Sequence, residues 1–330
     1  MTRGMTGADF GDDDGRTLAD AGEFVVIDRL VAGRTQAEAV MLGPGDDAAV
    51  VTAADGRTVV STDMLVQDRH FRLDWSSPHD IGRKAIAQNA ADIEAMGGRA
   101  TAFVVAFGAP SDTAVSAAAE VADGLWDEAR RLGASIAGGD LVRAPVWVIS
   151  VTALGDLDGR EPVRRSGARA GDTVAVSGEL GRSAAGFALW ERGLEGQTGF
   201  GELRQRHLTP RPPYGQGALA ADAGATAMTD VSDGLLADLG HIATASGVGI
   251  DVDSKLLEDD RLAVAGAAAA MGEDPWEWVL GGGEDHALAA TFPGPPPPGW
   301  RVIGRVVDGP AQVLVDGAMW AGNTGWQSFD

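Results

Sequence analysis

The spacing of apolar and polar residues along the chain predicts a mixture of helices and strands. A repeat near 3.6 residues predicts helices, and it occurs over residues 23–31, 78–96, 112–132, 182–190, 214–222 and 234–245. Short apolar and β-branched runs predict strands, and they occur over residues 48–52, 58–61, 101–107, 146–154, 173–177, 226–229, 249–252, 287–291, 301–307 and 312–315. Interleaved helices and strands are typical of α/β and α+β domains.

Two changes in composition divide the chain into segments. Residues 1–21 open with a polar, glycine-rich and acidic stretch, so we expect a disordered tail there. The stretch 155–172 is rich in Gly, Arg and Asp, and beyond it the strand and helix pattern starts again. We therefore expect two domains, over residues 22–155 and 156–330.

The composition is that of a globular protein with a strong acidic excess. Of 330 residues, 45% are hydrophobic and 22% are charged, which is enough apolar material for a sizeable core. With 26 basic and 48 acidic residues, the formal net charge is −22. Such a charge repels phosphate backbones and anionic lipid headgroups, so we expect no nucleic acid partner and no membrane partner.

The chain has no cysteine, which excludes disulfides, thiolate catalysis, iron–sulfur clusters and Cys-ligated zinc. Any metal ligand must then be an oxygen atom or a histidine nitrogen. The first residues contain no apolar run of signal-peptide length, and no stretch has the 18 or so apolar residues of a membrane span. We therefore expect a cytoplasmic location.

Carboxylates recur beside glycines and at the ends of apolar segments. The six clusters are Gly45-Asp46-Asp47, Ser61-Thr62-Asp63, Asn89-Ala90-Ala91-Asp92, the expected turn Gly138-Gly139-Asp140, Asp230-Val231-Ser232-Asp233 and Gly282-Gly283-Glu284-Asp285. Each alone is an ordinary turn or helix cap, and capping alone is an equal explanation of Ser232 and Asp233. Six clusters in one chain favour a shared ligand site, because ligands gather at segment ends in mixed sheets.

Two of these clusters indicate a bound cation. In a strand, Ser61 and Asp63 lie on one face and Thr62 on the other. On a helix, Asn89 and Asp92 lie one above the other within an apolar stretch, where a carboxylate needs a partner. Oxygen ligands of this kind suit Mg²⁺, which commonly bridges carboxylates to substrate phosphates.

Metal-assisted phosphoryl transfer is therefore the leading functional hypothesis. The usual phosphate-binding loop is absent, because neither Lys84 nor Lys255 completes a G-x-x-x-x-G-K pattern. Two alternatives stay open. One is a related ATP-dependent reaction such as a ring closure, and the other is a non-catalytic protein that binds Mg²⁺ and a nucleotide.

The order of the clusters along the chain closely resembles that in the bacterial thiamine-monophosphate kinases. The resemblance extends from about Gly22 to Phe329, and it also includes His70-Phe71, Lys84-Ala85, Arg165-Ser166-Gly167, Ser232-Asp233-Gly234-Leu235 and Gly325-Trp326. It implies a two-domain aminoimidazole ribonucleotide synthetase-like fold, in which an N-terminal α/β domain dimerises through its sheet and an α+β domain follows. It also implies transfer of the ATP γ-phosphoryl group to thiamine monophosphate, giving thiamine diphosphate and ADP.

The same resemblance assigns roles to individual residues. The implied ligands of several Mg²⁺ ions are Asp47, Ser61, Thr62, Asp63, Asp92, Asp140, Asp230 and Asp233. The implied ATP contacts are Gly139, Asp140, Arg165 and Ser232. The implied contacts of thiamine monophosphate are His70, Glu284 and Trp326. No catalytic base is expected, because a phosphate with a second pKa of about 6 is already largely a dianion at neutral pH.

Overall fold

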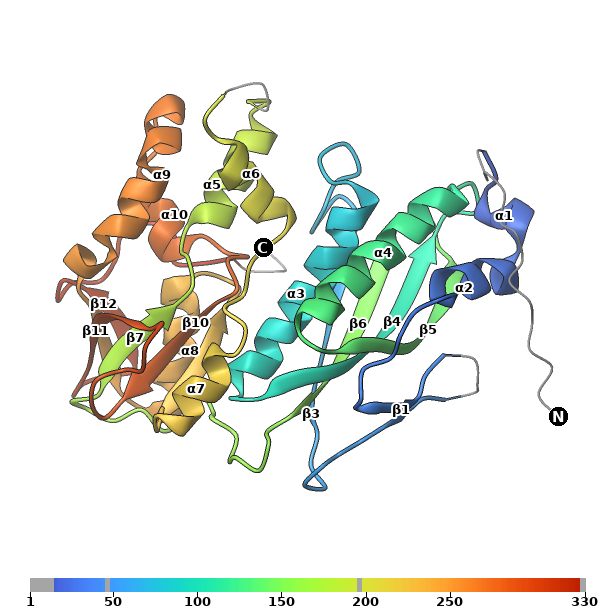
Figure 1. Cartoon of the computed structure of the whole chain (residues 1–330). Coiled ribbons are helices and arrows are strands. Elements are labelled where there is room, and N and C mark those ends of the chain that lie inside the picture. Colours follow the sequence, from blue (N-terminus) through green and yellow to red (C-terminus); the bar gives the residue numbers. More distant parts are fainter. Residues whose placement is uncertain (1–14, 45–47, 195–197, 327–330) are drawn as a thin grey trace.

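The computed structural model describes residues 15–44, 48–194 and 198–326, and these form two halves that each contain a sheet (Figure 1). The expected Mg²⁺ ligand Asp47 lies outside the described residues. None of the helices in the described ranges combines the length and the apolar character that a membrane crossing needs.

The N-terminal half is built on a four-stranded sheet with the order β3-β6-β4-β5. Its strands are β3 (Val59–Val66), β4 (Arg99–Ala109), β5 (Ser135–Arg143) and β6 (Val148–Asp156). β4 and β5 are parallel, and the other neighbours are antiparallel. Helices α3 (Pro78–Ala95) and α4 (Val115–Arg131) cover one face of this sheet (Figure 1).

The opposite face of this sheet is largely open. Val60 and Met64 on β3 are 59% and 52% exposed, and Val104 on β4 is also exposed. A hairpin of β1 (Val40–Leu42) and β2 (Val50–Val51) packs on one end of this face. The rest is an apolar surface on a half-covered sheet, which is unusual for a protein that stays monomeric.

Two short helices precede the sheet, α1 (Leu18–Ala21) and α2 (Glu23–Val31). A capping box begins α1, because the Thr17 side chain accepts a hydrogen bond from the Asp20 main chain and the Asp20 carboxylate accepts one from Thr17. The last residues of the expected tail are therefore helical. α2 has the expected range and contacts α4.

The C-terminal half is built on a six-stranded sheet with the order β12-β9-β11-β7-β10-β8. Its strands are β7 (Thr173–Ser177), β8 (Ala227–Val231), β9 (Gly249–Val252), β10 (Ala287–Phe292), β11 (Arg301–Val307) and β12 (Gln312–Val315). Its helices are α5 (Arg182–Glu191), α6 (Gly201–Leu208), α7 (Gln216–Asp222), α8 (Leu235–Ser246), the short 3₁₀ helix η1 (Ser254–Leu257), α9 (Glu258–Met271) and α10 (Pro275–Gly281). β8 and β10 are buried along their whole length, because α5, α8, α9 and α10 pack on one side of the sheet and α7 on the other.

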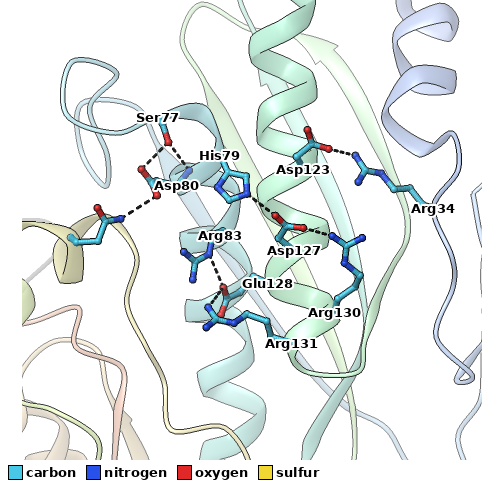
Figure 2. Close-up of polar contacts among 11 residues, drawn as sticks. Arg34, Ser77, His79, Asp80, Arg83, Asp123, Asp127, Glu128, Arg130 and Arg131 are labelled. Carbon is cyan, nitrogen blue, oxygen red and sulfur yellow. Dashed lines mark hydrogen bonds and ion pairs between the residues drawn. The ribbon is translucent and has the colours of Figure 1, made fainter. Parts of the chain in front are cut away.

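Two glycines let α3 and α4 cross closely. A Cβ on Gly82 would lie 2.1 Å from a main-chain oxygen of α4, and one on Gly124 would lie 2.0 Å from the carbonyl oxygen of His79. Ion pairs cross the same interface, and Arg83 Nε donates a hydrogen bond of 2.9 Å to the buried carboxylate of Glu128 (Figure 2). The two helices therefore form a rigid support behind the sheet.

α3 also joins the two halves of the molecule. Its buried Glu94 accepts hydrogen bonds from the main-chain nitrogens of Gly215 and Gly217, at 2.9 and 3.0 Å, at the start of α7. At its other end, Asp80 accepts a hydrogen bond from the Gln205 side chain of α6. Between these points α3 contacts β8 and β10. The middle of α3 therefore faces the ends of the C-terminal strands.

Most of the expected elements are confirmed, and the ranges of α2, β7, β9, β11 and β12 agree with the prediction. Helices α6, α9 and α10 were not expected, and in α9 a run of alanines removes the contrast between apolar and polar positions. The prediction of a turn at Gly138-Gly139-Asp140 is wrong, because these residues lie inside β5. Gly139 serves close strand packing there, since a Cβ would lie 2.0 Å from the Val105 carbonyl oxygen.

Candidate active site

β3 and the middle of α3 bring the first predicted ligands together. Ser61 and Asp63 face α3, and Ser61 Oγ donates a hydrogen bond of 2.5 Å to Asp92 Oδ2. Thr62 is exposed on the opposite side, where its hydroxyl donates to the Val151 carbonyl oxygen. The alternation along this strand is confirmed, and it separates the Thr62 side chain from the other two.

Asn89 joins β3 to α3 instead of facing a ligand. Its side chain is fully buried, its Oδ1 accepts a hydrogen bond of 3.0 Å from the Asp63 main chain, and its Nδ2 donates to the Ala85 carbonyl oxygen. Both polar atoms of the amide are thus satisfied within the protein. Asn89 sets the position of the strand that carries Ser61 and Asp63.

Asp230 enters the site from the C-terminal half, near the end of β8. Its side chain is 4% exposed, and its Oδ2 lies 3.4 Å from His286 Nδ1. Burial by itself lowers the pKa of His286, but the hydrogen bond and the charge of Asp230 outweigh burial and raise it. His286 and nearby Glu284 have φ values of 52° and 62°. Residues with a Cβ rarely adopt this left-handed conformation, and strained backbone of this kind is enriched at functional sites.

The turn between β8 and α8 is held by Asp238. Its Oδ2 accepts hydrogen bonds of 3.0 to 3.1 Å from the main-chain nitrogens of Ser232, Asp233 and Gly234. α8 begins without a side-chain cap, so capping does not explain Ser232 and Asp233. Gly234 has a φ of 133°, and a Cβ there would lie 2.8 Å from a main-chain oxygen of α10.

Burial and mutual repulsion raise the pKa values of the clustered carboxyl groups. The pKa of Asp92 is raised to about 6 by burial and by the charge of Asp230, with a smaller contribution from Asp63. Burial and Asp230 raise the pKa values of Asp63 and Asp233 as well, and they raise that of Asp238 to about 7. Adding a cation among these oxygens would remove the cause of the repulsion.

The chemistry of the donor set fits Mg²⁺. Asp63, Asp92 and Asp230 offer hard carboxylate oxygens from both halves of the molecule. Nearby, in the part of the chain that the structure describes, ligand atoms of Asp233, Asp238 and His241 lie within 4.8 Å of one another. Asp233 therefore extends the acidic site along the turn that leads into α8.

A buried ion pair lies beside the acidic cluster. Lys84 Nζ on α3 donates to Glu284 Oε2 at 3.1 Å and to the His70 carbonyl oxygen at 2.8 Å. His207 Nδ1 lies 3.3 Å from the same carboxylate oxygen. The His70 ring accepts a hydrogen bond from the Val66 main chain through Nδ1. Two of the three expected contacts of thiamine monophosphate, His70 and Glu284, are thus connected by one lysine.

The remaining predicted contacts border the turn after β8. The Trp326 main chain donates a hydrogen bond of 2.9 Å to the Asp233 carbonyl oxygen, and the Trp326 side chain is 61% exposed. The charge of Arg165 acts to lower the pKa of Asp233, although burial and Asp230 raise it overall. Ser232, Arg165 and Trp326 therefore surround Asp233.

Gly139 and Asp140 are not part of this group. They lie on β5, whereas Ser61 and Asp63 lie on β3 at the opposite edge of the sheet. Asp140 pairs in register with Ala106, and its side chain is exposed. The structure therefore separates these two residues from the predicted ligands on β3, α3 and β8.

Several further residues at the site were given no role by the sequence reasoning, including Lys84, which is part of the resemblance. Lys84 and Asp238 are charged residues within apolar helical segments, and that contrast is a signal for a buried polar role. His207 and His286 carry no local signal, because their importance depends on the partners that the fold supplies.

The chain is similar to known proteins over nearly its whole length. It matches the family models for the AIR synthase related protein N-terminal domain over residues 45–157 and C-terminal domain over residues 169–317. The thiamine-monophosphate kinase of Mycobacterium tuberculosis is 69% identical over 313 residues, which are 95% of this chain and 93% of that protein. The thiamine-monophosphate kinase of Corynebacterium glutamicum is 45% identical over 325 residues, 96% of each chain. The solved structure of AaThiL complexed with AMPPCP and TMP has a TM-score of 0.76 and 32% identity, and the match covers 95% of this chain and 99% of that one.

Proposed function

This chain belongs to the thiamine-monophosphate kinase family, and we propose that it carries out the family's reaction with Mg²⁺ ions bound in the carboxylate cluster. It is an ATP-dependent kinase that phosphorylates thiamine monophosphate to thiamine diphosphate and releases ADP. The observation that supports the metal role is the meeting of Asp63, Asp92 and Asp230 at the junction of the two halves. Burial and the charge of Asp230 raise the pKa values of Asp63 and Asp92, and a cationic partner would relieve the repulsion between these carboxylates.

The proposed chemistry needs no side chain as a base. The phosphate of thiamine monophosphate is already largely a dianion at neutral pH, so it can attack the γ-phosphorus directly. Asp63, Asp92 and Asp230 would hold Mg²⁺, which would supply positive charge to offset the negative charge of the transferring phosphoryl group. The protein contributes position: Asn89 holds β3 against α3, and Asp238 holds the turn that carries Ser232 and Asp233.

We assign the two substrates to neighbouring parts of the cluster. Ser232 and Arg165 are the proposed ATP contacts from this subunit. His70, Glu284 and Trp326 are the proposed contacts of thiamine monophosphate. The main-chain hydrogen bond of 2.7 Å from Glu284 to the Ser232 carbonyl oxygen supports this arrangement, because it places the two sets side by side.

We further propose a homodimer that forms through the open face of the N-terminal sheet. Gly139 and Asp140 lie on β5, which is three strand positions from β3, and a strand spacing of about 4.8 Å puts these edges roughly 14 Å apart. One ion cannot bridge Asp63 and Asp140 of the same subunit over that distance. A second copy seated on Val60 and Met64 would cover exposed apolar surface and supply its own β5 edge to the site.

A coupled ADP-release assay tests the proposed function. We expect ADP release with ATP, Mg²⁺ and thiamine monophosphate, and none with aminoimidazole precursors. A chelator should abolish turnover, and zinc should not restore it, because the proposed ligands are hard oxygens. Full turnover in chelator would refute the metal role, and ATP binding without turnover would favour a nucleotide-binding protein. We assign the enzyme to the cytoplasm, where ATP is available.

A further inference from the structure

One buried lysine has no part in the mechanism above, although it connects two proposed contacts of thiamine monophosphate. The Lys84 side chain is 2% exposed, and its ammonium donates to the His70 carbonyl oxygen and to Glu284 Oε2. His70 follows β3 in the N-terminal half, and Glu284 precedes β10 in the C-terminal half. The ammonium group of Lys84 therefore connects the two residues that we propose to contact thiamine monophosphate, one from each half of the molecule.

The surroundings of Glu284 keep its carboxylate ionised and oriented. Burial and the charge of Lys84 together lower the pKa of His207 to about 3, although the charge of Glu284 opposes them, so His207 is neutral at physiological pH. Burial raises the pKa of Glu284, but the charge and hydrogen bond of Lys84 together with the nearby His207 and His286 outweigh burial and lower the pKa to about 2. Lys84 and His207 both contact Oε2, and 32% of the Glu284 side chain stays exposed. The carboxylate can therefore present a negative edge to a ligand.

We propose that Lys84 is a positioning residue for thiamine monophosphate, the acceptor substrate. It acts by holding the carboxylate of Glu284 and the main chain at His70 in place. This inference rests on the proposed contacts of both residues with thiamine monophosphate. The thiazolium ring of that substrate carries a permanent positive charge, which a fixed carboxylate attracts. The main chain of Glu284 has a left-handed φ of 62° and is held by its hydrogen bond to the Ser232 carbonyl oxygen, while Lys84 holds its side chain.

A set of matched variants tests this role. Lys84→Met removes the charge at similar length, Lys84→Arg keeps the charge, and Glu284→Gln removes the partner charge. The double variant Lys84→Met with Glu284→Gln avoids leaving a lone carboxylate, so it guards against a simple loss of folding. Lys255→Met is the control, because Lys255 is the other lysine of the chain and is exposed on η1. For each variant, kcat, both KM values and the melting temperature are measured, together with binding of thiamine monophosphate by calorimetry without ATP.

The expected pattern separates positioning from a general structural role. Lys84→Met should raise the KM for thiamine monophosphate about tenfold or more and weaken its binding, with the KM for ATP nearly unchanged. Lys84→Arg should recover part of the loss. The double variant should be no worse than Glu284→Gln alone, because Lys84 acts largely through Glu284.

Several results would overturn the inference. An unchanged KM for thiamine monophosphate in Lys84→Met alone refutes it and leaves the proposed substrate contacts standing. Equal losses for both substrates, or effects that multiply in the double variant, refute it as well. An unchanged KM in Glu284→Gln refutes the proposed contact of Glu284 and the inference with it. A changed KM in Lys255→Met would assign the effect to overall charge and not to position.

Discussion

Replacing Asp92 with asparagine removes one negative charge from the carboxylate cluster and keeps the shape of the side chain. Without Mg²⁺, Asp92 lies near the charges of Asp230 and Asp63, and its pKa is raised from 3.8 to about 6. An asparagine can still accept the hydrogen bond from Ser61. The variant therefore isolates the effect of charge at this position.

The structure gives the size of the effect on stability. A pKa of about 6 in place of 3.8 corresponds to about 3 kcal/mol of unfavourable free energy for ionised Asp92 in the folded chain. Relaxation of the cluster reduces this, so we expect Asp92→Asn to raise the free energy of unfolding in chelator at about pH 8 by roughly 1 to 3 kcal/mol. The pKa is higher in the folded state, so the gain is absent below about pH 4, grows between about pH 4 and 6, and is fully present above that range.

Thermal unfolding and steady-state kinetics measure the two consequences. In chelator the variant should melt a few degrees higher than the parent protein, since 1 kcal/mol shifts the melting temperature of a large domain by roughly 2 °C. Mg²⁺ with a nucleotide analogue should stabilise the parent more than the variant. Turnover with saturating Mg²⁺ should fall about a hundredfold or more, because a group that stabilises transferring charge is lost.

The matched control is Asp308→Asn, which removes a carboxylate from an exposed position after β11 and should change neither property. The reasoning is wrong if Asp92→Asn is less stable than the parent in chelator and keeps its turnover. That pair of results would mean that Asp92 is a structural partner of Ser61 and holds no cation.

Three further predictions concern packing, the turn before α8 and the dimer. Gly124→Ala should lower the free energy of unfolding in urea by about 1 to 3 kcal/mol, because the new Cβ would lie 2.0 Å from the His79 carbonyl oxygen. The control Gly240→Ala has open space around the new Cβ and should raise the free energy of unfolding by up to about 1 kcal/mol. Asp238→Ala should raise the KM for ATP about tenfold, because three main-chain N–H groups of the turn lose their common acceptor, and an unchanged KM would contradict the role of that turn. Met64→Glu places a charge on the open sheet face, so light scattering should show monomers in place of the proposed dimer. A parent protein that is monomeric at micromolar concentration would refute the dimer itself.

Local patterns in the sequence were sufficient to predict most of the helices and strands. β7 and β9 were predicted with their observed ends, because each is a short apolar run between turn residues. The alternation along β3 correctly placed Ser61 and Asp63 on one face and Thr62 on the other. Such features depend only on neighbours in the chain, so the periods of two and 3.6 residues reveal them.

The sequence marked most of the residues that we propose for the site, but it did not determine their arrangement. Asp63, Asp92 and Asp230 were each marked by a carboxylate at a segment end, and the structure brings them together. Asp140 was marked in the same way, yet it lies at the opposite edge of the sheet. Strand order decides this difference, and strand order depends on long-range pairing that no local motif encodes.

The roles of the residues that support the site depend on the tertiary structure alone. Asp238 is a helical carboxylate whose three hydrogen bonds exist only because the turn after β8 folds back over it. Lys84 and Glu284 are 200 positions apart, and they meet because α3 packs between the two halves. Burial removes the water that would otherwise solvate both charges, so each charge depends on its partner. Burial is a property of the assembled fold and not of the local sequence.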